Sequence, residues 1–188
     1  MISKAAAEQF IDFYKQVLQL KKTVRKGWAE RKVPEPESVA EHSFGVSILA
    51  LFFSRDSGLD TEKLIKTALI HDLCEAITSD ITPNDNVAPE EKQKREYDAA
   101  VSVLGQMDES GELIELWKDF EYERTPEGKL VKELDRLEMV MQALDYEYTN
   151  NMRLDEFYEF AGKKLNTPAL KKIFNEIKNL RTGTVEGD

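Results

Sequence analysis

The residues best suited to chemistry lie in one short stretch, where His71 and Asp72 are adjacent and Glu75 follows three positions later. Consecutive helical residues point about 100° apart, so His71 and Asp72 can reach one point, and Glu75 returns to the same face. Converging imidazole and carboxylate groups are typical ligands of a divalent transition metal, and a nearby free carboxylate is a candidate acid or base. The stretch therefore predicts a metal centre on one helix that runs to about Ile77, although a lone His-Asp pair is more often a buried structural pair.

The only other histidine, His42, lies at the start of a second helix. Ser38 and Glu41 have the spacing of a capping box, which satisfies the first backbone N–H groups of a helix. The residues after them are apolar nearly all the way round: Val46, Ile48, Leu49, Ala50, Leu51, Phe52 and Phe53. Such a helix belongs in a core, so His42 is expected to face inward.

Two further carboxylates have suitable positions. Asp135 lies beside the apolar stripe of a helix that begins at Thr125-Pro126, four residues after Val131. A carboxylate there is usually solvated, but it also has the chemistry of a further metal ligand. Asp80 follows Glu75 in a loop, where an Asx turn is the simpler interpretation and a place in the same cavity is the alternative.

Residues 21–32 form a basic run in an acidic protein, and the run contains Gly27 and Trp28. A solvated loop is the ordinary interpretation. The position of the run directly before the His42 helix makes anion binding an equal alternative. Lys94 and Arg95 lie on a charged helix, where they are either surface residues or part of a site.

Composition sets the broad class. The 188 residues carry a net charge of −10, and 41% of them are hydrophobic. Nucleic-acid binding depends on clustered positive charge, so no nucleic-acid partner is expected. No apolar run approaches the roughly 20 residues that a membrane span needs, and the chain opens with no signal-peptide pattern, so no membrane association is expected. The single Cys74 excludes an internal disulfide and suits a reducing compartment, which makes the cytoplasm the expected location.

The remaining pattern is helical throughout. No segment alternates Val, Ile or Thr with polar residues, so no strand is predicted. The helix of residues 89–107 has an apolar stripe of Tyr97, Val101 and Leu104. Helices are predicted over residues 5–21, 38–57, 60–77, 89–107 and 111–121, then from 125 onwards and over 167–180. The predicted fold is an all-α bundle of about seven to eight helices.

His42, His71-Asp72 and Asp135 have the order H…HD…D. In this the chain resembles the HD-domain metal-dependent phosphohydrolases. Longer blocks resemble the 5'-deoxynucleotidase branch of that family: Pro36 to Ser43, His71 to Ala76, Asp80 to Pro83, Lys94 to Glu96, Val131 to Asp135, and Glu138-Met139. The resemblance implies a single HD domain over residues 1–188, with a core of about 10–150, C-terminal helices over 154–180 and a frayed tail of 182–188.

The resemblance implies hydrolysis of deoxyribonucleoside 5'-monophosphates to deoxyribonucleoside and phosphate. One divalent metal (Mn, Co, Ni, Fe or Zn) would be held by His42, His71, Asp72 and Asp135. Glu75 would be the catalytic acid or base. Asp80 would hold the sugar end or orient the attack, and Trp28 would pack against the deoxyribose.

One departure concerns the phosphate. Bacterial members of the branch have an Arg directly before the Trp, and here that residue is Gly27. Arg25 or Arg31 is the favoured replacement, because a guanidinium binds phosphate with two hydrogen bonds. The alternatives are an HD phosphohydrolase acting on another nucleotide or phosphate ester, and a non-catalytic metal-binding scaffold. The resemblance also implies a homodimer, for which Phe157, Tyr158 and Phe160 are apolar candidates.

Overall fold

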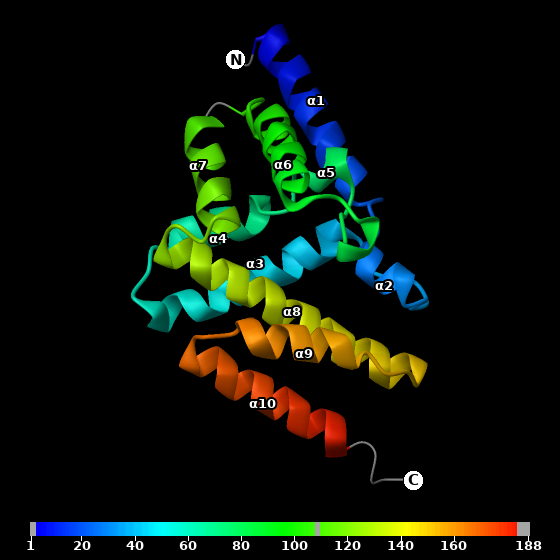
Figure 1. Ribbon diagram of the computed structural model, residues 1–188. Coiled ribbons are helices and arrows are strands. Elements are labelled where there is room, and N and C mark those ends of the chain that lie inside the picture. The colour runs from blue at the N-terminus through cyan, green and yellow to red at the C-terminus, as the bar shows by residue number, and fades with distance from the viewer. Residues whose placement is uncertain (1–2, 108–109, 184–188) are drawn as a thin grey trace.

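The computed structural model describes residues 3–107 and 110–183, and it confirms the all-α prediction (Figure 1). Within these ranges there are ten α-helices, one short 3-10 helix and no strand. The α-helices are α1 (Lys4–Leu20), α2 (Lys26–Glu30), α3 (Val39–Ser57), α4 (Thr61–Ile70), α5 (Glu75–Thr78), α6 (Pro89–Leu104), α7 (Ser110–Glu121), α8 (Pro126–Asn150), α9 (Asp155–Lys164) and α10 (Pro168–Gly183), and the 3-10 helix is η1 (Pro83–Asp85). The two helices beyond the predicted number are α2, which lies in the basic run, and α5.

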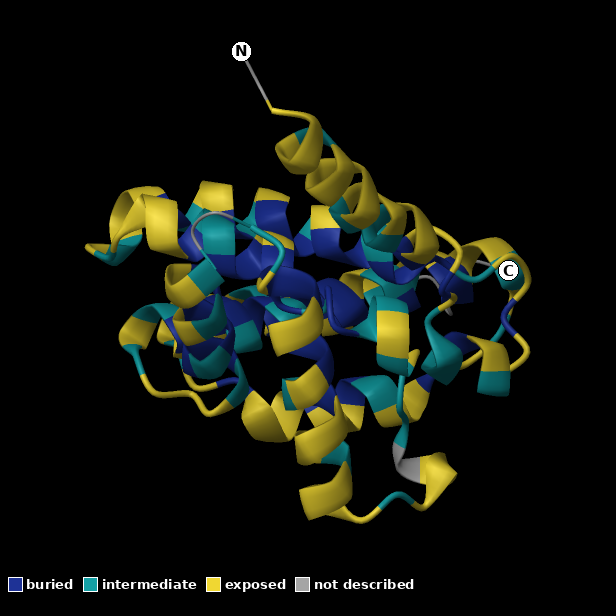
Figure 2. Ribbon diagram, turned by 90° about the horizontal axis from the view of Figure 1, so that it is seen from above, coloured by how far each residue is buried: buried dark blue, intermediate teal, exposed yellow. Residues whose placement is uncertain are grey.

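The long helix α8 is the centre of the bundle. It packs against α3, α4 and α7 on one side and against α9 and α10 on the other, as Figure 1 shows. Helices α1, α5 and α6 lie beyond α3 and α4. In Figure 2 the buried residues gather in the middle of the molecule, and the N-terminal helix is mostly exposed. No helix in the described ranges is both long and apolar enough to cross a membrane.

The apolar core consists of two clusters. The larger one joins α3, α4 and α8 to α9 and α10, and it includes Leu134, Leu137 and Val140. The smaller one joins the ends of α1 and α4 to α6 and α7 around Trp117. His42 and His71, which are 0% and 1% exposed, belong to neither apolar cluster although they are buried with them.

The predicted helix starts are confirmed. Ser38 and Glu41 form both hydrogen bonds of the capping box at the start of α3. Asp60 caps α4, and Thr125 caps α8. Gly128 in the first turn of α8 is required by packing, because a Cβ there would lie 2.1 Å from the carbonyl oxygen of Asp119.

The prediction of one continuous helix through the His-Asp motif is wrong. Helix α4 ends at Ile70, the next four residues form turns, and α5 begins at Glu75. Leu73 N–H and Glu75 N–H donate to carbonyls only three residues earlier, which tightens the chain relative to an α-helix. The tightened turn directs the side chains of His71 and Asp72 toward each other.

The prediction that α3 lies wholly in the core is also wrong. Val46 and Ala50 are fully buried, but one face of the helix is exposed. That face carries Phe44, Ile48, Leu51 and Phe52, which are 67%, 49%, 51% and 70% exposed.

Helix α6 also differs from prediction, and helix α1 leaves part of its apolar surface exposed. Phe13 and Val17 of α1 pack on the smaller cluster, whereas its Phe10 is 59% exposed. On α6 the predicted Val101 is 38% exposed, and the buried face is instead Glu96, Ala99, Ala100, Val103 and Leu104. Alanines permit close helix packing without the large side chains by which the stripe was predicted.

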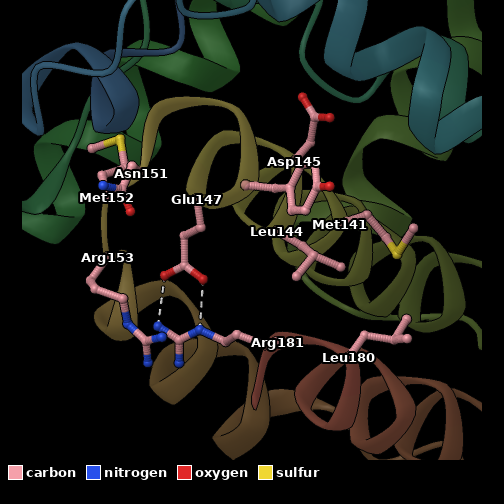
Figure 3. Close-up of a pocket in the computed structure, with 10 residues that line it drawn as sticks. Met141, Leu144, Asp145, Glu147, Asn151, Met152, Arg153, Leu180 and Arg181 are labelled. Atoms are coloured by element: carbon pink, nitrogen blue, oxygen red, sulfur yellow. Dashed lines mark hydrogen bonds and ion pairs between the residues drawn. The ribbon is translucent and has the colours of Figure 1, made fainter. Parts of the chain in front are cut away.

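Helix α10 is attached to α8 by a buried ion pair. Arg181 donates through two nitrogens to the two carboxylate oxygens of Glu147, each at 2.7 Å (Figure 3). Glu147 also accepts from the backbone N–H of Leu154 at 2.5 Å. The predicted frayed tail begins inside α10, which continues to Gly183, and residues 184–188 lie outside the described residues.

Candidate metal centre and phosphate site

Four side chains from three parts of the chain meet at one point. His42 comes from the first turn of α3, Asp135 from α8, and His71 with Asp72 from the turn between α4 and α5. Nε2 of His42 lies 3.2 Å from Oδ1 of Asp135 and 3.7 Å from Oδ2 of Asp72. Nε2 of His71 lies 3.1 Å from that same Asp72 oxygen. Ligand atoms of His42, His71 and Asp135 all lie within 4.8 Å of one another. The fold therefore brings together all four predicted ligands.

The other nitrogen of each histidine is held by the protein. Nδ1 of His71 donates to the carbonyl oxygen of Ala68 at 2.7 Å, and Nδ1 of His42 faces Oε2 of Glu138 at 2.5 Å. Both Nε2 atoms are buried and have no hydrogen-bond donor or acceptor partner among the described residues. A histidine ligand commonly donates its second N–H to a carbonyl or carboxylate, which directs the free nitrogen at the metal. Two orphaned Nε2 atoms beside two carboxylates fit a divalent cation.

The histidines and carboxylates at this point shift one another's pKa values. Burial and Arg25 lower the pKa of His42, but the neighbouring carboxylates of Asp135 and Glu138 outweigh them and raise the pKa to about 10. Burial raises the pKa of Asp72, but His71 and His42 outweigh it and lower the pKa to about 2. Asp135 is held ionised in the same way. The carboxylates are thus ready to bind a cation, and a metal must displace a proton from His42.

Glu75 lines the cavity that contains these ligands, but its pKa is shifted in the opposite direction from those of Asp72 and Asp135. Burial, followed by the negative charges of Asp72 and Asp80, raises its pKa well above the ordinary value, against the smaller effects of Arg25 and His42. Its Oε2 is buried and has no hydrogen-bond partner among the described residues. A carboxyl group with a raised pKa keeps its proton to a higher pH than an ordinary carboxyl group does, and it can donate that proton to a leaving group.

The metal cavity has a volume of about 190 Å³ and is lined by His71, Asp72, Glu75 and Asp135. Arg25 also lines this cavity. Burial lowers the pKa of Arg25, but the combined charges of Asp135, Asp72, Glu37 and Asp80 raise it above the ordinary value. The guanidinium therefore lies in the field of the metal-site carboxylates, where it can contact a phosphate bound to the metal.

Asp80 lines the same cavity. Its Oδ2 accepts a 2.7 Å hydrogen bond from the backbone N–H of Lys26, the first residue of α2. Arg25, the residue before α2, makes no side-chain cap of its own. Asp80 thus caps α2 from across the cavity and holds the backbone that carries Arg25. Residues 24 and 38 also form a single antiparallel bridge, which joins this segment to the start of α3.

Two lysines of the cavity were missed in the sequence. Lys92 lies near the start of α6, and its Nζ donates to the carbonyl of Ile81 at 3.0 Å. Lys132 on α8 lies 3.9 Å from the ring centroid of Phe120. Both have a sequence signal: Lys92 precedes the buried Glu96 by four residues, and Lys132 precedes Asp135 by three, so each shares a helix face with a residue of the cavity. Lys94 and Arg95, for which the sequence left a surface position and a place in the site as alternatives, are exposed.

Trp28 and Arg31 line a second, outer cavity of about 490 Å³. Trp28 is only 1% exposed. Its Nε1 donates to Oε1 of Glu37 at 2.9 Å, and its ring packs against Phe157 and Tyr146. Arg31 forms an ion pair with Glu156 at the surface and does not line the metal cavity. Of the two candidate arginines, only Arg25 lines the cavity of the predicted metal ligands.

The carboxylates behind His42 were not assigned a role in the sequence. Glu37, His42 and Glu138 form a second buried group of possible metal-binding atoms. Glu138 follows Asp135 by three residues on the same face of α8, which is the signal that could have identified it. Gly45 permits this arrangement, because a Cβ there would lie 2.7 Å from Oε1 of Glu138.

Comparison with known proteins gives a consistent result. The HD-domain family profile matches residues 17–177. The 5'-deoxynucleotidase HDDC2 of Danio rerio is 42% identical, over 93% of this chain and 88% of that protein. The 5'-deoxynucleotidase hdd1 of Schizosaccharomyces pombe is 33% identical, over 94% of this chain and 92% of that protein. Among solved structures, a conserved hypothetical protein from Pyrococcus furiosus is similar with a TM-score of 0.77 and 34% identity, over 90% of this chain and 99% of the other.

Proposed function

The chain belongs to the HD-domain family, and we propose that it is a metal-dependent phosphomonoesterase that converts deoxyribonucleoside 5'-monophosphates into deoxyribonucleosides and phosphate. HD domains depend on a metal, and this chain has candidate ligands for one. The observation that carries the proposal is the meeting of two orphaned imidazole nitrogens and two carboxylates beside Arg25 and the buried carboxyl group of Glu75. This combination matches a dianionic phosphate ester, which needs positive charge at its oxygens and a proton for its leaving group.

We assign His42, His71, Asp72 and Asp135 as the ligands of one divalent ion. Mixed imidazole and carboxylate ligands suit Mn, Co, Ni, Fe or Zn, and they do not choose among these. When bound, such an ion polarises the phosphate and makes a water molecule more acidic. Glu138 and the carbonyl of Ala68 hold the two rings in the orientation that directs Nε2 at the ion.

The protein supplies the rest of the phosphate site from three cationic side chains. Arg25 contacts the phosphate oxygens, and Lys92 and Lys132 contribute point charges from α6 and α8. Lys92 forms an ion pair with Glu96, and Lys132 forms one with Glu121, which holds these two side chains in place. Together with a bound metal ion, these three side chains would offset the carboxylates of the cavity, so that a protein of net charge −10 can bind an anion there.

Glu75 acts as the acid. As water attacks phosphorus, the bond from phosphorus to the 5'-oxygen breaks, and the Glu75 carboxyl donates its proton to that oxygen. A proton from the attacking water restores the acid, so the products are a free 5'-hydroxyl and phosphate. Asp80 positions Arg25 and faces the sugar end, while Trp28, which lines the outer cavity, packs against the deoxyribose.

Phosphate release from a panel of deoxyribo- and ribonucleoside 5'-monophosphates tests this proposal. The protein is treated with a chelator and then assayed with added Mn, Co, Ni, Zn or Mg. We expect release that depends on metal and is confined to the deoxy substrates. Equal rates on ribonucleotides would contradict the sugar assignment. Metal binding without release from any nucleotide or other phosphate ester would contradict the enzymatic proposal and support a non-catalytic scaffold.

We further propose that the chain forms a homodimer through the exposed face of α3. The residues first considered for this role do not form such a face, since Tyr158 is buried and Phe157 packs on Trp28. The exposed face of α3 is apolar between two charged ends, with Glu41 at the first turn and Arg55 at the last. A soluble monomer rarely exposes a contiguous apolar surface of this kind.

The order of residues on this face is self-complementary. Ile48 lies midway between Glu41 and Arg55, and also midway between Phe44 and Phe52. When two copies of α3 pack antiparallel about a twofold axis at Ile48, Phe44 meets Phe52 of the second copy, and Glu41 meets Arg55 of the second copy. A twofold interface needs a surface that is complementary to itself, and this arrangement provides it.

Sedimentation analysis tests the interface. We expect a mass near twice the 21.6 kDa of one chain, and we expect Ile48→Glu to give monomers. Ile77→Glu is the matched control, because Ile77 is 50% exposed against 49% for Ile48 but lies on α5. A dimeric Ile48→Glu protein, or dissociation by both substitutions, would contradict the proposed face.

The remaining assignments are of a broader kind. We propose that residues 1–188 form one domain, because α8 contacts helices of both core clusters. A cytoplasmic location and the lack of a nucleic-acid partner remain proposals that rest on the single Cys74 and on the acidic net charge.

A further inference from the structure

The outer cavity continues from the metal cavity. The two cavities share Arg25, Asp80, Lys92, Lys132 and Asp135. The outer cavity then extends away from the metal to α9, where Phe157 and Phe160 line it. A ligand whose phosphate is at the metal therefore has an adjoining cavity in which to place its other end.

The length of the outer cavity can be estimated from residues of helix α8 that line it. Asp135 lies at the metal end, and Met139 lines the outer cavity four residues later, which corresponds to about 6 Å along a helix that rises roughly 1.5 Å per residue. A nucleoside monophosphate has its sugar between the phosphate and the base. With the phosphate at Asp135, the sugar lies beside Asp80 and Trp28, and the base reaches the level of Met139 and α9.

The surface at that level is aromatic and already ordered. The Phe157 ring packs on the Trp28 indole with centroids 4.2 Å apart, and this contact restricts the orientation of the Phe157 ring. Phe160, one turn further along α9, is 51% exposed. Single exposed phenylalanines are common on protein surfaces. Phe160 differs because it lines a cavity that leads to the metal ligands, together with the apolar side chains of Met139 and Ile81.

We propose that Phe160, supported by Phe157 and Met139, is the surface on which the nucleobase of the substrate packs. The inference rests on the proposed function and specifies how the base is recognised. Gly27 also lines the outer cavity, and a Cβ there would make an ordinary van der Waals contact with the Phe157 ring at 3.6 Å. The residue at which this chain departs from the bacterial pattern thus borders the proposed base site.

The polar groups around the site indicate a broad base preference. Arg31 is paired with Glu156, and Glu30 accepts hydrogen bonds from Thr82 and Asn84. These groups already have partners, so they contribute little hydrogen bonding that would distinguish one base from another. Stacking tolerates any base and increases with ring area. The site should therefore accept all four deoxynucleotides and bind purines more tightly than pyrimidines.

Kinetics on substrates with and without a base test the inference. For Phe160→Ala we expect the KM for deoxyadenosine 5'-monophosphate to rise about 5- to 100-fold, as for loss of one aromatic stacking partner. The KM for 2-deoxyribose 5-phosphate, which has no base, should not change. Phe160→Trp should keep or lower the nucleotide KM. Phe10→Ala is the matched control, because Phe10 is 59% exposed on α1 and lines neither cavity.

A second readout does not depend on catalysis or metal. Saturation-transfer NMR with deoxyadenosine should show transfer to the base protons in the wild type and in Phe10→Ala, and a loss of transfer in Phe160→Ala. Unchanged transfer and unchanged KM in Phe160→Ala would overturn the inference, as would equal losses on the two substrates. A wild type that hydrolyses neither substrate would instead refute the proposed function, and the NMR result would then decide the base site by itself.

Discussion

Substitution of Gly45 by alanine tests whether Glu138 orients His42, because it sets a gain in the helix propensity of α3 against displacement of the Glu138 side chain. Glycine inside a helix is unfavourable, and replacing it with alanine ordinarily stabilises a helix by about 1 kcal/mol. At position 45 the new Cβ would lie 2.7 Å from Oε1 of Glu138 and 3.0 Å from its Cγ. Real atoms do not approach so closely, so the Glu138 side chain must move.

The displaced carboxylate is the one that holds Nδ1 of His42. Loss of a hydrogen bond to a charged group costs about 1.5 to 3 kcal/mol, which exceeds the gain in helix propensity. We therefore expect Gly45→Ala to lower the free energy of unfolding by about 0.5 to 2 kcal/mol. Loss of a group that orients a metal ligand typically weakens metal binding about 10- to 100-fold.

The assay is calorimetric titration of Mn or Co into chelator-treated protein, together with urea unfolding of the metal-free form. Gly111→Ala is the matched control, because nothing lies within 4 Å of a Cβ at that position in α7. The control should bind metal like the wild type and unfold at equal or higher urea concentration. Wild-type metal affinity in Gly45→Ala, with stability raised by about 1 kcal/mol, would refute the claim that Glu138 orients His42.

Three further predictions concern the carboxylates of the metal cavity. Glu75→Gln should keep its metal, measured by elemental analysis, and lose about 10²- to 10⁴-fold in kcat, whereas loss of the metal would show that Glu75 is a ligand. Because Glu75 acts as an acid with a raised pKa, wild-type activity should fall as pH rises through that pKa. Asp135→Ala should lose the metal, and normal binding in the same elemental analysis would show that this ligand is misassigned. Burial raises the pKa of Glu96 from 4.5 to about 7, so the folded state holds its proton more tightly than the unfolded state, and stability is lost as pH rises across that window. Urea unfolding of metal-free Glu96→Gln should show little change at pH 5 and a gain of up to about 3 kcal/mol at pH 8, and an equal effect at both pH values would exclude ionisation as the cause.

The sequence alone determined the features that depend on neighbouring residues. The Ser38–Glu41 capping box and the Thr125-Pro126 helix start need only a few consecutive side chains, and both are present in the structure. The all-α class follows from the same local periodicity. The order of His42, His71-Asp72 and Asp135 also led to the right family, because the motif is a property of the chain rather than of its folding.

The tertiary structure decided how those residues meet and which surfaces remain exposed. The break after Ile70 could not be foreseen, since the turn is stabilised by its position between packed helices rather than by a Gly or Pro. Lys92 lines the metal cavity and Lys94 does not, because of which face of α6 is buried. That face carries alanines, whose small side chains give only a weak hydrophobic pattern in the sequence. Glu138 became important only through its distance to His42 across the α3–α8 contact. The exposed face of α3 has the same composition as a core helix, and only the structure shows that it is not covered by the described part of this chain. We propose that a second copy covers it, since the core of a dimer interface buries the same kinds of side chain as a domain core.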